Sequence, residues 1–167
     1  MTAPSGPLHR SVSVLHLPPE GSDVTIEASP EERAALAADF GLPAIRSLVG
    51  RFHLAGSASR VDVTGRVTAE ITQVCVVTLD EFDAAVDEEV AADFVAPDER
   101  RPAPEPGEEG DADELVNGQI DLGALAAEFL ALGLDPYPRK PGAVFSQGEQ
   151  EPTSSPFQAL RRLTSGE

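Results

Sequence analysis

The sequence has little of several residue types on which specialised proteins depend. It contains one cysteine, no tryptophan and 5% aromatic residues. A single cysteine excludes an internal disulfide framework, and the scarcity of aromatic side chains leaves the core to valine, leucine, isoleucine and alanine. No apolar run approaches the ~20 residues that a membrane-spanning helix needs. No N-terminal stretch joins a basic flank to a long apolar segment, so we expect a cytoplasmic protein that does not act in a membrane.

Motifs that mark nucleotide, metal or nucleophile sites are also missing. The sequence has no G-x-x-x-x-G-K-[ST] phosphate loop, no G-x-G-x-x-G after a strand pattern and no G-x-S-x-G nucleophile elbow. His9, His16 and His53 have no partner at metal-ligand spacing. Carboxylates are plentiful, but acid–base catalysis needs them in unlike, partly buried surroundings, and runs of acids are usually solvated. We therefore expect no catalytic residue, no cofactor and no metal.

Negative charge is in excess, and the excess is concentrated in the middle of the chain. The formal net charge is -17. Sixteen acidic residues and two arginines fall between Asp80 and Asp121. Such a field repels phosphate backbones and attracts basic partners, and it weakens within about 10 Å at 0.1 M salt. We expect no binding of DNA or of bare RNA through this region; a solvated surface that only maintains solubility is the simpler interpretation.

The first half of the chain predicts strands around one helix. Two alternating runs, 11–17 and 22–28, are joined by PPEG and predict a hairpin. The sequence SPEE that follows combines an N-cap serine, a proline at the first helical position and a capping-box glutamate. It predicts a helix over about 30–40. A second hairpin is predicted from 46–56 and 60–72, and the regular alternation of the latter gives it one wet face.

The second half predicts a strand, a loop and another helix. Residues 82–95 satisfy both strand and helix periods, and their valine and phenylalanine content favours a strand. The acidic, proline-rich stretch 97–116 predicts a mobile loop without core contacts. Asp121 caps a predicted helix over 122–132, which Gly133 ends. The apolar stripe predicted for this helix comprises Leu122, Leu125, Phe129 and Leu132.

These elements predict the α+β fold class: a mostly antiparallel β-sheet or a partly open barrel, with two packed helices and a long acidic loop. The strands are expected to be antiparallel because their links are too short for parallel crossovers. Residues 8–145 form the single expected domain, and residues 146–167 form a linker and a short amphipathic C-terminal tail.

Cys75 lies in the run QVCVVTLDEF and is the one thiol in the chain. If the strand over 60–72 continues in register, Cys75 shares the buried face with Ile71. Burial among valines predicts a raised pKa and poor reactivity, and acids rather than basic residues follow it. We expect Cys75 to be a core residue. An enzyme that uses this thiol, or a pair of carboxylates, is the alternative.

Three segments carry a family resemblance. They are QVCVVTLDEF, ELVNGQIDLGALAAEFLALGLDPYPRKPGAVF and the terminal SPFQALRRL, within about residues 60–163. Together they resemble the YceD-like family of large ribosomal RNA subunit accumulation proteins, and the form with DPYPRKPG is most similar to alphaproteobacterial members. Many relatives carry C-x-x-C where this chain has Cys75 and Thr78. A zinc or disulfide role for that position therefore cannot operate within this chain.

The resemblance implies a non-enzymatic cytoplasmic factor needed for normal levels of large-subunit ribosomal RNA. It supplies no molecular mechanism. Affinity for phosphates comes from lysine and arginine, so an acidic chain is poorly suited to bind bare RNA. We therefore hypothesise that it binds a basic ribosomal protein or a large-subunit assembly factor. A generic acidic protein-interaction module is a further alternative, and the sequence leaves the oligomeric state open.

The candidate partner-binding residues form two groups. The acidic group belongs to the predicted strand over 82–95 and the residues just before it: Asp80, Glu81, Asp83, Asp87, Glu89 and Asp93. The second group lies C-terminal to the predicted second helix: Tyr137, Arg139, Lys140, Phe157 and Leu160. Asp87, Glu89 and Asp93 share strand parity, so we expect them on one wet face.

Overall fold

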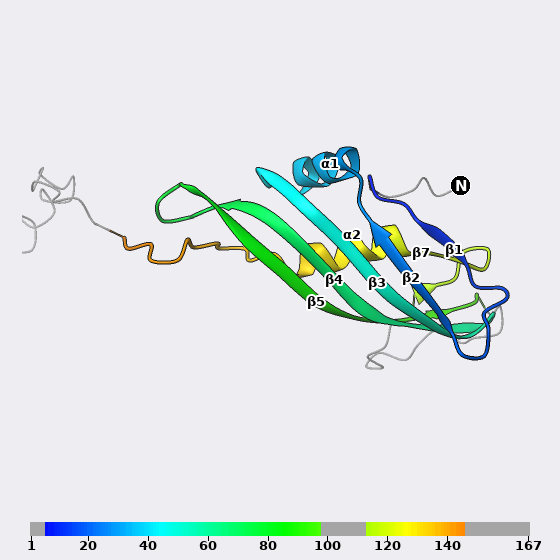
Figure 1. The fold of residues 1–167 in the computed structure, drawn as a ribbon. Helices are drawn as coiled ribbons and strands as arrows, with labels where there is room; N and C mark the ends of the chain where they lie inside the picture. Colours follow the sequence, from blue (N-terminus) through cyan, green and yellow to red (C-terminus); the bar gives the residue numbers. More distant parts are fainter. Residues whose placement is uncertain (1–5, 98–112, 146–167) are drawn as a thin grey trace, which may run out of the picture.

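A curved five-stranded sheet forms most of the structure, a computed structural model that describes residues 6–97 and 113–145 (Figure 1). The elements are β1 (Ser11–Ser13), β2 (Ser22–Glu27), α1 (Pro30–Phe40), β3 (Ala44–Ser57), β4 (Arg60–Val74), β5 (Glu81–Val95), β6 (Asp113–Glu114), β7 (Gln119–Asp121) and α2 (Leu122–Leu132). The large sheet has the order β2-β3-β4-β5-β6, and β1 and β7 form a small second sheet. The large sheet stays open, so the α+β prediction is confirmed without barrel closure.

Long antiparallel ladders hold the centre of the sheet together. β4 pairs with β3 on one side and with β5 on the other, and the β4–β5 register is unbroken from Arg60↔Val95 to Val74↔Glu81. The predicted alternation of β4 is confirmed, because one set of alternate residues is buried: Val61, Val63, Val67, Ala69 and Ile71. The stretch that satisfied both periods is the strand β5. One face of this sheet is therefore core and the other is wet.

Two capped helices cover the core face. Ser29 accepts a hydrogen bond from the Glu32 N–H, while the Glu32 carboxylate accepts one from the Ser29 N–H, so α1 begins with the predicted capping box. Asp121 caps α2 by accepting from the N–H groups of Gly123 and Ala124. Side chains of both helices join the core, including Leu36 of α1 and Leu125 of α2.

The stripe predicted for α2 is correct at its beginning and wrong at its end. Leu122 and Leu125 are buried, but Leu132 is 69% exposed, and Leu130 is buried in its place. At about 100° per residue, Leu132 lies within about 20° of the buried Leu125, so rotation around the helix does not explain its exposure. Leu132 is the last residue of α2, and Leu130 is the last buried residue of the helix.

The N-terminal hairpin prediction is wrong. β1 pairs with β7, with Val12 opposite Ile120, and β2 pairs with β3. PPEG does form a turn, in which the Gly21 N–H donates to the Pro18 carbonyl at 2.9 Å. This turn leads the chain from the small sheet to the large one, so the two runs it joins have different partners.

The predicted loop over 97–116 ends earlier than expected. Residues 98–112 lie outside the described residues, as does the linker and tail over 146–167. Asp113 and Glu114 form β6, which pairs in parallel with the end of β5, and Leu115 is buried in the core. Leu115 therefore anchors the chain where a loop without core contacts was predicted. Among the described residues, neither helix has the length and apolar character needed to span a bilayer.

Candidate functional site

The acidic residues of β5 lie in a row on the wet face of the sheet. The exposed residues of this strand alternate with buried or half-buried ones, and they comprise Glu81, Asp83, Ala85, Asp87, Glu89, Ala91 and Asp93. The expected common face of Asp87, Glu89 and Asp93 is thus confirmed. Every member of the row is acidic or alanine. From Glu81 to Asp93 the row spans about 40 Å at ~3.3 Å per residue.

Arginines of the neighbouring strands pair with several of these acids. Arg66 of β4 lies 2.6 Å from Asp87, and Arg60 lies 3.4 Å from Asp93. Arg46 of β3 lies 2.8 Å from Asp83. All three pairs are exposed, so each contributes little to stability, typically 0–1 kcal/mol.

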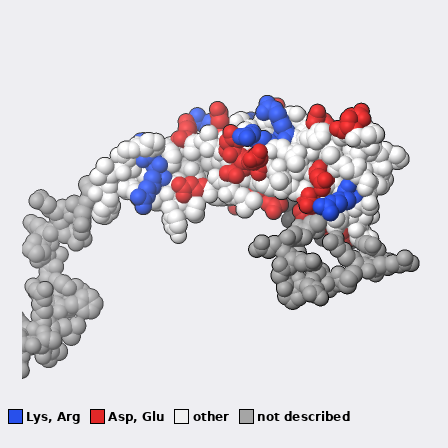
Figure 2. Space-filling model, turned by 90° about the horizontal axis from the view of Figure 1, so that it is seen from below, with Lys and Arg blue, Asp and Glu red and all other residues white. Residues whose placement is uncertain are grey.

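Acidic and basic groups consequently alternate on part of the surface. Seen from below, Figure 2 shows acidic side chains gathered near the middle of the molecule with basic ones among them. Asp87 and Glu89 both lie beside Arg66, which is opposite Glu89 in the β4–β5 register and bonded to Asp87. The wet face is therefore less negative than the sequence of β5 alone predicts, although acids still outnumber arginines on β5 and β4.

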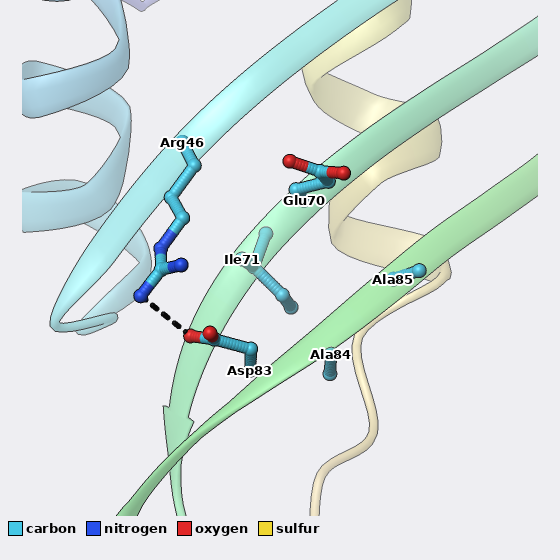
Figure 3. Close-up of a pocket in the computed structure, with 6 residues that line it drawn as sticks. All are labelled: Arg46, Glu70, Ile71, Asp83, Ala84 and Ala85. Carbon is cyan, nitrogen blue, oxygen red and sulfur yellow. Dashed lines mark ion pairs between the residues drawn. The ribbon is translucent and has the colours of Figure 1, made fainter.

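A hollow of about 280 Å³ lies at one end of the row, lined by Arg46, Glu70, Ile71, Asp83, Ala84 and Ala85 (Figure 3). The β3–β4 register shifts between Ile45 and Ser47, so Arg46 is the extra residue of a bulge. Its guanidinium reaches over β4 to Asp83, as the dashed line in Figure 3 shows. The two alanines leave the space open. The hollow is polar at its rim and offers one arginine and two carboxylates.

A second hollow, of about 320 Å³, lies over β2, β3 and β4. His53 lines it and lies 2.7 Å from Asp23, a pair that is well exposed. Arg51 also lines it. Most of the residues that line the two hollows are exposed on the wet face, but core residues also line them: Ile71 the first hollow and Phe52 the second.

Cys75 lies in the turn between β4 and β5, and it is fully buried as predicted. The strand does not continue through it. The Cys75 N–H donates to the Asp80 carbonyl at 2.8 Å, and its own carbonyl accepts from the Leu79 N–H at 2.9 Å. Leu79 has a φ of 62°, a left-handed conformation that is uncommon for a residue with a side chain. The thiol thus lies at the closing pair of the hairpin.

The expectation of a raised pKa for this thiol is wrong, because hydrogen bonds to the sulfur outweigh the effect of burial. Hydrogen bonding from the Thr78 side chain, and then from the backbone of Lys140, Thr78 and Val77, lowers the pKa of Cys75 to about 7. Burial acts in the opposite direction, but these donors outweigh it. The Thr78 N–H itself lies 3.5 Å from Sγ. The sulfur is therefore enclosed by donors, not only by valines.

The segment after α2 closes over this turn. The Val76 N–H donates to the Pro138 carbonyl at 2.9 Å, and Lys140 Nζ lies 3.6 Å from the Asp80 carboxylate. Tyr137, which directly precedes Pro138 in the chain, is exposed. The structure therefore brings Asp80 together with Lys140 from the second candidate group, about 40 Å from Asp93 along β5. Phe157 and Leu160 lie outside the described residues.

A polar cluster near the N-terminus was not predicted. Arg10 binds both carboxylate oxygens of Glu32, at 2.7 and 2.9 Å, and its N–H donates to Asp121 at 2.8 Å. His9 Nδ1 lies 2.6 Å from the other oxygen of Asp121. The hydrogen bond and charge of Asp121 raise the pKa of His9, although burial opposes them. The cluster joins the caps of α1 and α2, and no local sequence pattern indicates it because its members are far apart in the chain.

The described residues contain no group of three or more histidine, cysteine, aspartate or glutamate side chains that could hold a metal ion. Cys75 has Thr78, not a second thiol, at the other end of its turn. The arrangement along β5 offers charge and hydrogen-bonding groups, suited to contact with a cationic surface.

Comparison with known proteins identifies a family. Residues 63–163 match a family model described as "Large ribosomal RNA subunit accumulation protein YceD". The match includes most of β4, all of β5 and α2, and the segment that covers Cys75. No curated protein and no solved structure matches the chain. Because the family match spans more than half of the sequence, this chain belongs to the YceD family of large ribosomal RNA subunit accumulation proteins.

Proposed function

We propose that the protein is a non-enzymatic cytoplasmic factor that binds a basic ribosomal protein or large-subunit assembly factor along β5. Membership of the family gives it a role in the accumulation of large-subunit ribosomal RNA. The observation that carries the proposal is the row of outward-facing residues on β5, which holds acids and alanines only. A basic client protected in this way would be available for assembly with the RNA.

Electrostatics favour a protein client over bare RNA. A protein that grips RNA releases counterions through many lysine and arginine contacts. Here the net charge is -17, and Arg46, Arg60 and Arg66 on the wet face already have carboxylate partners. A basic protein surface meets the remaining acids without repulsion, and its approach is accelerated at low salt.

The enzymatic alternative receives less support. The pKa of Cys75 near 7 would provide thiolate at neutral pH, but the residue has no exposed surface. Its sulfur is enclosed by the turn and by the segment at 138–140, which leaves no approach for a substrate. Low pKa without access does not make a nucleophile.

Affinity purification from cells tests the proposal. The tagged full chain is isolated at several salt concentrations, and the bound proteins and RNA are identified together. A triple variant, Asp87→Asn, Glu89→Gln and Asp93→Asn, neutralises the row without changing side-chain size. We expect basic large-subunit proteins to co-purify with the wild type, to be lost as salt rises, and to bind the variant more weakly and with a flatter salt dependence.

A charge-matched control distinguishes the effect of the acidic row on client binding from the effect of the protein's net charge. Glu20→Gln, Asp39→Asn and Glu128→Gln change the same number of charges at exposed positions away from β5. This control should retain its client. The row variant should lose at most about 1 kcal/mol of unfolding free energy for each of the two broken arginine pairs. Equal client recovery by the row variant and the wild type would contradict the proposal.

A further inference from the structure

The open side of β5 is a long strand edge. Among the described residues, β6 alone pairs on that side, and it covers only Phe94 and Val95. On its other side β5 is fully paired with β4. A strand edge presents unpaired N–H and C=O groups that can pair with another extended chain. From Glu81 to Asp93 this edge is about 40 Å long.

Hydrogen bonds at both ends of β5 establish which residues face this edge. The Asp80 carbonyl accepts from the Cys75 N–H, and the Ala96 N–H donates to the Ser59 carbonyl. Cys75 and Ser59 directly flank β4, so the backbone groups of the even-numbered residues of β5 point toward β4. The Val95 carbonyl accepts from Leu115, on the opposite side. Because the register between these ends has no bulge, the direction alternates throughout. The odd-numbered residues therefore point their backbone groups at the open edge.

These same odd-numbered residues carry the acidic row. Their side chains lie on the wet face while their N–H and C=O groups face outward in the plane of the sheet. A chain that paired with this edge would place alternate side chains directly beside Asp83, Asp87, Glu89 and Asp93, about 5 Å away between Cβ atoms. β4 already does so from the other side, where Arg66 pairs with Asp87 and Arg60 with Asp93.

We propose that the basic client adds an extended segment to the edge of β5, with alternate arginine or lysine side chains beside the acidic row. This inference rests on the proposed function and specifies how the client is held. Backbone hydrogen bonds would provide affinity, and the acids would select a basic strand. A second copy of this chain fits poorly, because pairing β5 with itself would bring acids opposite acids.

Amide exchange tests the position of the contact in the unmodified protein. The probe is a peptide of about ten residues that alternates arginine and threonine, with blocked ends. In the free chain, the amides of Asp83, Ala85, Asp87, Glu89 and Ala91 should exchange rapidly, while the even-numbered amides of β5 exchange slowly. Adding the peptide should slow the odd-numbered amides. If these are already slow in the free full chain, another part of the chain or a second copy covers the edge, and the proposal is overturned.

A proline at the edge removes one outward N–H without breaking the β4 ladder. Ala85→Pro is such a variant, since proline is tolerated where the N–H of an edge strand faces solvent. We expect this variant to bind the peptide about tenfold more weakly, because it loses the hydrogen bond of the Ala85 N–H and places the proline ring at the edge. Ala85→Thr, which keeps the N–H but also enlarges the side chain at the same position, should bind the peptide more tightly than Ala85→Pro, and the difference between the two variants reports the lost donor. Ala91→Pro repeats the test if the first variant melts at a lower temperature.

A chemical change in the peptide provides the complementary control. Methylating the backbone nitrogens of its arginines retains the charge but removes the donors of the residues that face the acids. This peptide should slow none of the odd-numbered amides. Equal binding by both peptides, or by Ala85→Pro and Ala91→Pro alongside the wild type, would overturn the edge contact.

The outcomes distinguish the two proposals. If the proline variants bind normally while the triple neutralised variant loses its client, the acidic row binds by charge alone and only the edge inference fails. If the triple neutralised variant retains its client from cells, the proposed function fails. Parallel losses in the proline and neutralised variants, with protection of the odd-numbered amides, support both.

Discussion

Glu32 connects the start of α1 to the N-terminal segment. Its carboxylate accepts hydrogen bonds from both Nη atoms of Arg10 and from the Ser29 N–H. The Arg10 hydrogen bonds first, and the Ser29 N–H next, lower the pKa of Glu32 from 4.5 to about 2. Arg10 also reaches Asp121, the cap of α2. One carboxylate therefore supports contacts among three parts of the chain.

We expect Glu32→Gln to lower the unfolding free energy at neutral pH by about 1–2 kcal/mol, because it weakens a charged pair and the capping box. The native pKa is lower than the unfolded one, so ionised Glu32 stabilises the fold fully above about pH 4.5. That contribution is lost as the pH falls toward 2. Urea denaturation from pH 7 to 2 should show the gap between variant and wild type narrowing.

Glu31→Gln is the matched control for this prediction. Glu31 lies in the same first turn of α1 but has no ion pair within the described residues. It should change the unfolding free energy by a few tenths of a kcal/mol. A gap between Glu32→Gln and wild type that stays constant down to pH 2 would show that the carboxylate charge is not responsible.

At the scale of elements, α2 supports the strand that presents the acidic row. Leu122, Leu125 and Leu130 are buried in the core beneath the sheet. Gly133, which ends the helix, lies so close to β5 that a Cβ there would meet the Val86 and Glu88 side chains. Helix α2 thus fixes the inner face of β5, and the proposed partner contacts lie on the outer face and at the edge of the strand.

Alanine substitutions along α2 should separate core from surface. Leu125→Ala is expected to lower the unfolding free energy by roughly 2–5 kcal/mol, because it leaves a cavity in the core. Leu132→Ala makes the same chemical change at an exposed position and should lower it by less than about 0.5 kcal/mol. Urea denaturation measures both. If Leu125→Ala left stability unchanged and impaired client binding, the buried side of α2 would instead be a docking surface.

The whole molecule is strongly acidic, and its charge is unevenly arranged along the chain. Most of the excess lies between Asp80 and Asp121, a span that includes β5. Three arginines on β3 and β4, Arg46, Arg60 and Arg66, are engaged with carboxylates on β4 and β5, and Arg51 of β3 has no ion pair among the described residues. The surface therefore has a long stretch of negative potential that attracts cations, and no comparable stretch of positive potential that would attract phosphates.

We expect the purified full chain not to bind bare ribosomal RNA. Fluorescence anisotropy of a labelled large-subunit RNA fragment at low salt should show no saturation up to ~100 μM protein, where basic proteins bind non-specifically. Adding the co-purified basic client should produce binding that depends on the client. Tight binding of RNA by the chain alone would indicate a phosphate site elsewhere, and Arg139 and Lys140 would be the first residues to substitute.

Local patterns in the sequence determined the two helices and the long strands, and with them much of the candidate surface, but not the short strands β6 and β7. The capping box places the start of α1, because its hydrogen bonds join Ser29 to Glu32, only three residues away. Alternation places β4, because side chains of a strand change face at every residue. Residues 82–95 fit both periods, and their valine and phenylalanine content favoured the strand β5. Once β5 is a strand, the common face of Asp87, Glu89 and Asp93 follows from the strand period. The family segments likewise lie along stretches of continuous sequence.

Only the tertiary structure decided which groups meet across long separations. In the structure β1 pairs with β7 and not with β2, and Leu115 lies in the core. The side chains of Arg46, Arg60 and Arg66 lie beside the acids of β5. The tertiary structure also surrounded Cys75 with donors, including Lys140, and so lowered a pKa that burial alone would raise. Such contacts depend on strand register and helix rotation. Register is a property of two segments together, so neither segment's own pattern contains it.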